Sequence, residues 1–173
     1  MTVCEPLNMQ HIYRTATLED KEQLQTLGLK AYGQFKNVLT KENWHTMDVF
    51  LQGAKSYTDL LSKATCFVCE TAGKLIGMAF VLSHGNPTDI FDSDWSYIRM
   101  VGVDPAHGGQ GIGKNLTRMC VAHARESGEK IIALHTSELM DTARHIYEHV
   151  GFEKMKEIAP LYGTRYWLYQ MAL

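Results

Sequence analysis

The glycine cluster HGGQGIGKN, residues 107–115, is the strongest sign of a binding site in this chain. It separates an apolar stretch that ends at Val103, expected to be a strand, from an amphipathic stretch that starts near Ile112, expected to be a helix. A glycine-rich connection from strand to helix gathers unpaired backbone N–H groups at a helix N-terminus, where they bind anions. Glycine lets a phosphate approach these amides and permits positive φ angles. We therefore expect a phosphate site, and the chemistry depends on which phosphate binds.

Two of the candidate ligands that could carry this phosphate are nucleotides. The segment from Gly108 to Asn115 reads G-x-x-x-x-G-K-N, which differs in its last residue from the nucleoside triphosphate loop G-x-x-x-x-G-K-[ST]. Asn115 stands where a hydroxyl should bind Mg²⁺, and little chain follows for the parallel sheet of such enzymes. For a dinucleotide, G-x-G-x-x-G would need a glycine at Lys114 or at Leu116. The triphosphate loop remains an alternative, whereas the dinucleotide pattern does not fit.

The third candidate is the pyrophosphate of coenzyme A. The stretch VGVDPAHGGQGIGKNL, followed one strand and one helix later by HIYEHVGF, resembles the GNAT superfamily of N-acetyltransferases. The resemblance covers residues 12–173, and its specific part runs from Ile98 to Phe152. It implies direct transfer of the acetyl group of acetyl-CoA, through a tetrahedral intermediate, to a primary amine of a small molecule or peptide. It also implies an α+β fold with a mixed, twisted sheet of about seven strands and about four helices.

The resemblance assigns roles by position. In that family a tyrosine on the later helix stands near the thioester sulfur, which makes Tyr147 the expected general acid. The strand before the loop offers backbone groups to the pantetheine arm, and the loop amides hold the pyrophosphate. The cofactor-binding residues that the resemblance implies are Met100, Val101, Gly102, Val103, Gly108, Gly109, Gln110, Gly111, Ile112, Gly113, Lys114 and Met140.

Three positions depart from the family pattern. Gly108 replaces the usual Arg or Gln at the start of the loop, which removes one side-chain contact to the phosphates. The amides and Lys114 must then hold the phosphates, and whether the affinity for CoA is lower is an open question. Tyr97 matches the position of a glutamate base in many relatives, and Met140 that of an asparagine. The departures leave open a non-catalytic sensor that binds acyl-CoA without turnover. The general base is unassigned, with Glu70, His84, Asp92, Asp94, His135 and water as candidates.

Composition narrows the function classes. A chain of 173 residues that is 45% hydrophobic suits a single domain, residues 1–173, with its core over 12–173. The net charge of −2, without any run of Lys or Arg, gives no electrostatic basis for a nucleic-acid partner. The start MTVCEPLNMQ lacks a signal-peptide pattern, and the longest apolar run, within LIGMAFVL, is too short for a membrane span. We expect a cytoplasmic monomer or homodimer whose partner is the amine substrate, with no membrane contact.

The cysteines and histidines do not indicate a metal site. Cys66 and Cys69 form C-x-x-C, but TCFVCE reads as a strand, in which residues three apart point to opposite faces. The histidines lack the spacing with carboxylates or thiols that metal ligands show. We therefore expect reduced thiols and no metal.

The helices follow from periodicity and caps. Thr17 and Thr40 are expected to cap the first two helices, and SYTDLLS to form a turn or short helix capped by Ser56. Ser137 is expected to cap the last helix, which ends at Gly151. Tyr147 lies at the edge of that helix's apolar stripe, where it can reach a cleft. The stripe consists of Leu139, Ala143, Ile146 and Val150.

Strands account for most of the rest. The stretch TCFVCETAGKLIGMAFVLS predicts a hairpin with its turn at Ala72-Gly73, and KIIALHTS a buried strand. FEKMKEI and TRYWLYQMAL predict two final strands, and the two late β-α-β units predict parallel pairing. The acidic loop SHGNPTDIFDSD reads as a solvated connection, or alternatively as a rim that attracts a cationic amine.

Overall fold

The computed structural model describes residues 10–173. Cys4 and the start of the chain, on which the expectation about a signal peptide depends, lie outside the described residues. In residues 10–173 no helix has both the length and the apolar character needed to cross a membrane.

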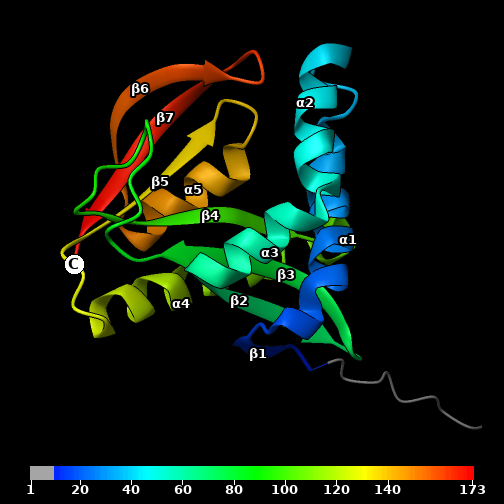
Figure 1. The fold of residues 1–173 in the computed structure, drawn as a ribbon, viewed down its shortest axis with the longest axis horizontal. Coiled ribbons are helices and arrows are strands. Elements are labelled where there is room, and N and C mark those ends of the chain that lie inside the picture. Colours follow the sequence, from blue (N-terminus) through cyan, green and yellow to red (C-terminus); the bar gives the residue numbers. More distant parts are fainter. Residues whose placement is uncertain (1–9) are drawn as a thin grey trace, which may run out of the picture.

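A seven-stranded sheet in the order β1-β2-β3-β4-β5-β7-β6 forms the middle layer (Figure 1). All neighbours pair antiparallel except β4 and β5, so the expected mixed sheet of seven strands is confirmed. The prediction of parallel pairing between the two strands of the second late β-α-β unit, β5 and β6, is wrong. The last strand, β7, lies between them and pairs antiparallel with both. The strands are β1 (Ile12–Thr15), β2 (Ala64–Thr71), β3 (Lys74–Leu82), β4 (Ser96–Val103), β5 (Ile131–Ser137), β6 (Glu153–Leu161) and β7 (Thr164–Ala172).

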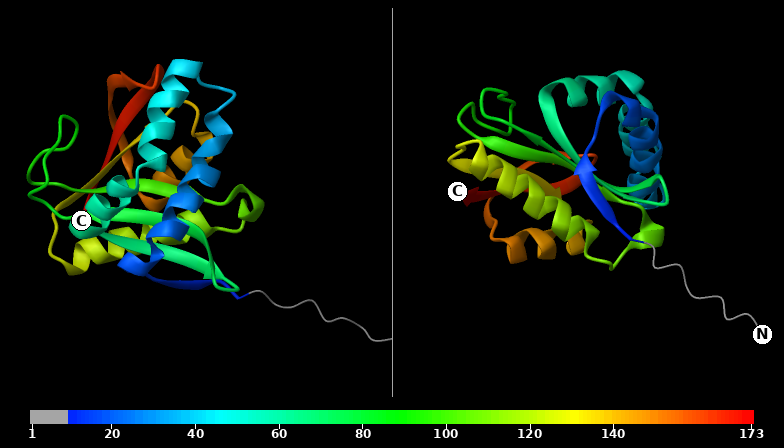
Figure 2. Two further views of the ribbon diagram at one scale, coloured as in Figure 1. Left: turned by 45° about the vertical axis from the view of Figure 1, so that its right-hand side comes forward. Right: turned by 90° about the horizontal axis from the view of Figure 1, so that it is seen from below.

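Helices cover both faces of the sheet (Figure 2). The first three, α1 (Lys21–Tyr32), α2 (Lys41–Gln52) and α3 (Ala54–Lys63), lie on one side, and α4 (Ile112–Glu126) and α5 (Asp141–Val150) lie on the other. The sequence predicted about four helices, and the described residues form five because SYTDLLS lies in a ten-residue helix rather than a turn. Cys66 packs in the core under α1 and α3, whereas Cys69 packs in the core under α4, so the two cysteines of C-x-x-C face opposite ways as expected.

The predicted helix starts are confirmed at Thr17 and Thr40, whereas Ser56 lies within α3, whose N-cap is Gly53, and the start at Ser137 is also wrong. The Thr40 hydroxyl accepts a hydrogen bond from the Asn43 N–H, and Thr17 forms a capping box with Asp20 that leads through a short 3-10 turn into α1. Ser137 does not cap α5. Its hydroxyl instead accepts from the Leu139 N–H in a turn, and the helix begins only at Asp141. Leu139 and Met140 therefore lie just before α5 rather than within it.

Candidate active site

The sheet opens between β4 and β5. The two strands pair only at Ser96 with Ile132 and Tyr97 with Ala133, and beyond these pairs they separate (Figure 1). From Ile98 onward, the edge of β4 that would face β5 has no strand partner among the described residues. The Val101 carbonyl on this edge accepts a hydrogen bond from the Tyr32 hydroxyl, and the other backbone groups there, which have no strand partner, can bind another molecule.

A bulge in β4 shapes the wall of this opening. Met78 lies opposite Gly102 and Phe80 lies opposite Arg99, so two steps along β3 match three steps along β4. The extra residue is Met100, which has a φ of 53°. Because of the bulge, Arg99 and Met100 both lie on the α2 side of the sheet, where they approach Phe50 and the core formed by α2, whereas Ile98 packs under α4.

The glycine loop lies between the end of β4 and the start of α4. Gly109 and Gly111 have φ angles of 74° and 76°, and nothing lies within 4 Å of a Cβ built on either. The Asn115 N–H makes the first bond of α4, to the Gly111 carbonyl, and the N–H groups of residues 109–114 have no acceptor among the described residues. Ile112 contributes only its backbone, because its side chain is 1% exposed and packs in the core. The structure thus presents the open cradle of amides that a pyrophosphate requires.

A groove connects the glycine loop to a second hollow. The first part, the loop groove, passes along the end of β4, the glycine loop and the residues before α5. The second part, the aromatic pocket, encloses about 770 Å³, some of it open to solvent. Tyr32, Val101, Met140 and Ala143 line both parts and join them. Of the expected cofactor-binding residues, Met100, Val101, Gly102, Val103, Gly108, Gly113 and Met140 line these two hollows, whereas Gly109, Gln110, Gly111, Ile112 and Lys114 lie in the loop and first turn of α4.

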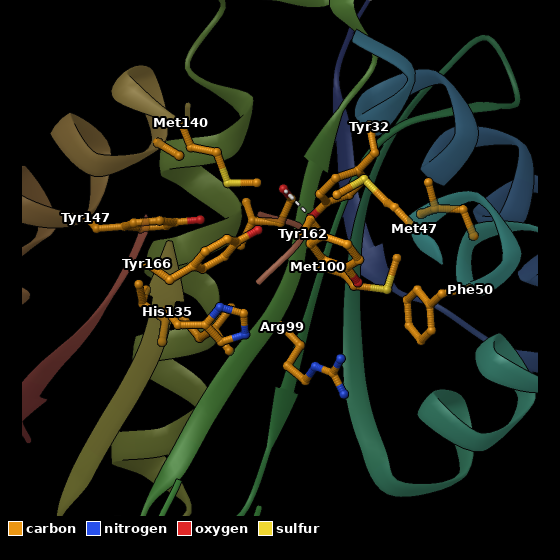
Figure 3. A pocket seen from close by; sticks show the side chains of 15 residues that line it. Tyr32, Met47, Phe50, Arg99, Met100, His135, Met140, Tyr147, Tyr162 and Tyr166 are labelled. Carbon is orange, nitrogen blue, oxygen red and sulfur yellow. Dashed lines mark hydrogen bonds between the residues drawn. The ribbon is translucent and has the colours of Figure 1, made fainter. Parts of the chain in front are cut away.

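Tyr147 enters the aromatic pocket from α5 (Figure 3). Its ring is 6% exposed and packs edge-on against Phe152, with ring centroids 6.1 Å apart. Figure 3 shows the hydroxyl directed toward the pocket near Tyr166 and Met140, and no hydrogen-bond partner for it occurs in the described part of the chain. Burial raises the pKa of Tyr147, so the phenol is protonated at neutral pH.

The candidate bases are not gathered at one place. Glu70 accepts a hydrogen bond from Arg14 at 2.8 Å on β2, and His84 lies 3.1 Å from a carboxylate oxygen of Glu129. Asp92 and Asp94 are exposed in the loop before β4, and none of the loop's aspartates lines the two hollows described above. The structure therefore gives no support to an acidic rim at this opening.

His135 is the one candidate base that lines the aromatic pocket. Burial, together with the positive charge of Arg99, lowers its pKa to about 4, so the imidazole is neutral at pH 7. The Nδ1 atom is buried and has no partner among residues 10–173. Tyr97, at the position of the family's glutamate, donates its hydroxyl to the Asn86 carbonyl at 2.9 Å and stacks on Phe91, so it is engaged in structure.

Several pocket residues were not singled out from the sequence. Arg99 interrupts the apolar strand SYIRMVGV, and a charge at such a position was the available signal. Tyr32 comes from α1, and Tyr162 and Tyr166 come from the end of the chain. The turn at Gly163 lies so close to α2 that a Cβ on Gly163 would overlap the side-chain nitrogen of Asn43.

Comparison with known proteins assigns this chain to a family. A model of the acetyltransferase (GNAT) family matches residues 31–152. The chain belongs to the GNAT family. This GNAT chain is 33% identical over 88 residues to mycothiol acetyltransferase of Thermobispora bispora, covering 51% of the chain and 30% of that protein. It is 34% identical over 101 residues to human N-acetyltransferase 8B, covering 58% of the chain and 43% of that protein. The chain spans less than half the length of these two curated relatives.

Solved structures confirm the GNAT fold. The PaiA N-acetyltransferase of Thermoplasma acidophilum, crystallised with coenzyme A, superposes with a TM-score of 0.77 over 95% of this chain and 100% of that chain, at 12% identity. The ribosomal-protein-S18-alanine N-acetyltransferase of Escherichia coli gives 0.71 over 94% of both chains at 14% identity. At these identities the likeness concerns the fold alone. The parallel sheet required by the nucleoside triphosphate alternative is missing, since β4 and β5 form the one parallel pair in residues 10–173.

Proposed function

We propose that this GNAT protein transfers the acetyl group of acetyl-CoA directly to a primary amine of a small molecule or peptide. The observation that carries the proposal is the pair of adjoining hollows, which begin at Gly108 and Gly113 beside the free amides of the glycine loop and end at Tyr147. Acetyl-CoA would supply an activated acyl group: the amine nitrogen adds to its carbonyl carbon, and the tetrahedral intermediate then loses the CoA thiolate. The protein must hold the cofactor, polarise the carbonyl and deliver a proton to the departing sulfur.

The loop and the free edge of β4 are proposed to hold acetyl-CoA. Amides of residues 109–114, at the positive end of α4, suit the pyrophosphate. Gly108 lacks the side chain that relatives offer, so backbone donors carry this contact. The edge of β4 from Met100 to Val103 would pair with the pantetheine arm, and the Val101 N–H is the proposed donor to the thioester carbonyl.

Tyr147 is proposed to protonate the sulfur. Its raised pKa keeps the proton on the phenol, which suits an acid and excludes a phenolate base at neutral pH. The nucleophile needs a free amine, and alkylammonium groups have a pKa near ~10. His135, with a pKa of about 4, is too weak to take that proton efficiently, so we infer that water removes it and that His135 positions the amine.

The release of free thiol from acetyl-CoA, measured with a panel of amines, tests the proposal. Tyr147→Phe is expected to lower kcat by about 100-fold or more, within the range of general-acid catalysis, while the Kd for acetyl-CoA changes little. An equal loss of turnover and of cofactor binding would contradict the acid role. Absence of thiol release with every amine would contradict catalysis.

A non-catalytic acyl-CoA sensor is the second candidate. It is favoured by Gly108 and by the lack of a carboxylate among the residues that line the aromatic pocket. Calorimetry with CoA and acetyl-CoA, run beside the thiol assay, separates the two functions. A sensor binds both ligands without turnover, whereas an enzyme releases CoA when an acceptor is present.

A further inference from the structure

Arg99 is a cation at the far end of the aromatic pocket from the loop groove. It is half-buried, and no carboxylate pairs with it among residues 10–173, where the ion pairs involve other cations. The guanidinium carbon lies 5.9 Å from the centroid of the Phe50 ring. Figure 3 shows it between His135 and Phe50, at a distance from the Tyr147 hydroxyl. A half-buried guanidinium without a partner is a ready binding group for an anion.

The pocket has no charge to offset Arg99. Its lining residues include no Asp or Glu, and His135 is neutral at pH 7. The neighbouring hollow that Arg99 also lines contains Asp59, together with Lys63. The aromatic pocket that leads to Tyr147 is therefore bordered by one positive charge and by no carboxylate. Acceptors with several ammonium groups are repelled there, and acceptors with a carboxylate are attracted.

The walls between Arg99 and Tyr147 are apolar. Met47, Phe50 and Leu51 of α2 face Tyr162 and Tyr166 of the β6–β7 hairpin. Surfaces of this kind bind an apolar or aromatic body, because they gain by removing apolar area from water and by stacking on rings. The pocket thus combines one anion-binding end, apolar walls and one catalytic end.

From this arrangement we propose that the acceptor is a primary amine on an apolar or aromatic body that also carries a carboxylate, which Arg99 binds. The inference rests on the proposed function and adds the substrate class. Arg99 holds the carboxylate through its two parallel N–H donors, so the amine at the other end of the molecule points toward the thioester. Arg99 acts on the reaction through binding and orientation, without taking part in proton transfer.

The test compares carboxylate acceptors with their amides. The panel contains aromatic and aliphatic amino acids whose amine and carboxylate are separated by one to six carbons, each paired with its carboxamide. For each pair the quantity is the ratio of kcat/KM for the acid to kcat/KM for the amide. Comparing this ratio between wild type and Arg99→Gln cancels the intrinsic reactivity of each amine.

In the wild-type protein the best pair is expected to favour the acid. In Arg99→Gln the ratio should fall by about 10-fold or more, in line with a lost hydrogen bond to a charged group. Arg99→Lys should keep part of the preference, because the charge remains without the planar fork. Arg118→Gln, which removes an exposed arginine on α4, should leave the ratio unchanged. The Kd for CoA should match wild type in all three variants.

Failure of this inference differs from failure of the proposed function. If amides or polyamines are preferred and Arg99→Gln does not change the ratio, the substrate class is wrong while acetyl transfer stands. If the protein releases no thiol with any member of the panel or with polyamines, both the transfer and the substrate class are refuted.

Discussion

The Tyr32 hydroxyl donates a hydrogen bond to the carbonyl oxygen of Val101 over 3.3 Å. This contact ties the end of α1 to the free edge of β4 at the junction of the loop groove and the aromatic pocket. Burial raises the pKa of Tyr32, so the phenol remains a donor across the working pH range. The contact fixes one backbone carbonyl beside the amides proposed to meet the thioester.

Tyr32→Phe removes this donor. We expect the free energy of unfolding to fall by about 0.5–1.5 kcal/mol, the usual net worth of one hydrogen bond, and the KM for acetyl-CoA to rise by about 5-fold. Tyr169→Phe is the matched control, because the Tyr169 hydroxyl also donates a hydrogen bond, to Glu148 over 3.0 Å, but Tyr169 does not line the groove. Urea unfolding and initial-rate kinetics measure both effects. A KM that rises equally in Tyr169→Phe would show that the effect is not local.

A left-handed glycine in the loop offers a second test. Gly111 at the start of α4 and Gly128 after its end have φ angles of 76° and 79°, and both face open space. Replacing either by Ala should cost about 1–2 kcal/mol of stability, the usual penalty for a side chain in this conformation. Only Gly111→Ala is expected to weaken CoA binding as well, because it shifts the amides of residues 109–114. Calorimetry with CoA and thermal unfolding of both variants separate strain from binding.

The local parts of the site could be predicted from the sequence. The glycine loop, the start of α4 and the place of Tyr147 on α5 depend on neighbours within a few residues, where turn chemistry and helical periodicity act. The hairpin turn at Ala72-Gly73 is confirmed for the same reason, with φ angles of 48° and 73°.

The opening of the sheet depends on distant segments. Insertion of β7 beside β5, and the separation of β4 from β5, are set by tertiary pairing that no local pattern records. The bulge at Met100 likewise breaks the two-residue alternation, so a strict alternation would put Met100 on the α4 side. The walls contributed by α2 and by the Tyr162 turn meet only in the folded chain.

The pH dependence of turnover tests the state of Tyr147. Its pKa is raised above the usual value of about 10, so the acid remains protonated through pH 9. We expect kcat/KM for an alkylamine to rise from pH 6 to pH 9 as the ammonium loses its proton, without a falling limb. Rates between these limits, with and without Tyr147→Phe, provide the measurement. A falling limb below pH 9 that disappears in Tyr147→Phe would mean that the phenol loses its proton within the working range.

The acid stability of the fold depends on the ion pair between Arg14 and Asp20. Two guanidinium nitrogens of Arg14 lie 2.8 and 2.9 Å from the Asp20 carboxylate, which also accepts from the Thr17 N–H at 2.8 Å. The hydrogen bonds from Arg14, more than any other contact, hold the pKa of Asp20 below its usual value. The unfolded chain therefore binds a proton at higher pH than the folded chain does. The resulting stabilisation is complete above about pH 4, the unfolded pKa, and is lost as the pH falls through the lower folded pKa.

Asp20→Asn should remove this pH dependence. We expect the variant to be less stable than wild type at pH 6 and the difference to shrink as the pH falls from about 4 toward 2, because the wild-type carboxylate becomes protonated there. Urea unfolding of both proteins at several pH values measures this difference in the free energy of unfolding. Glu157→Gln is the control, since the exposed pair of Glu157 with Arg165 is screened by solvent and should change the slope less. A constant difference between wild type and Asp20→Asn at all pH values would assign the role of Asp20 to uncharged hydrogen bonding instead.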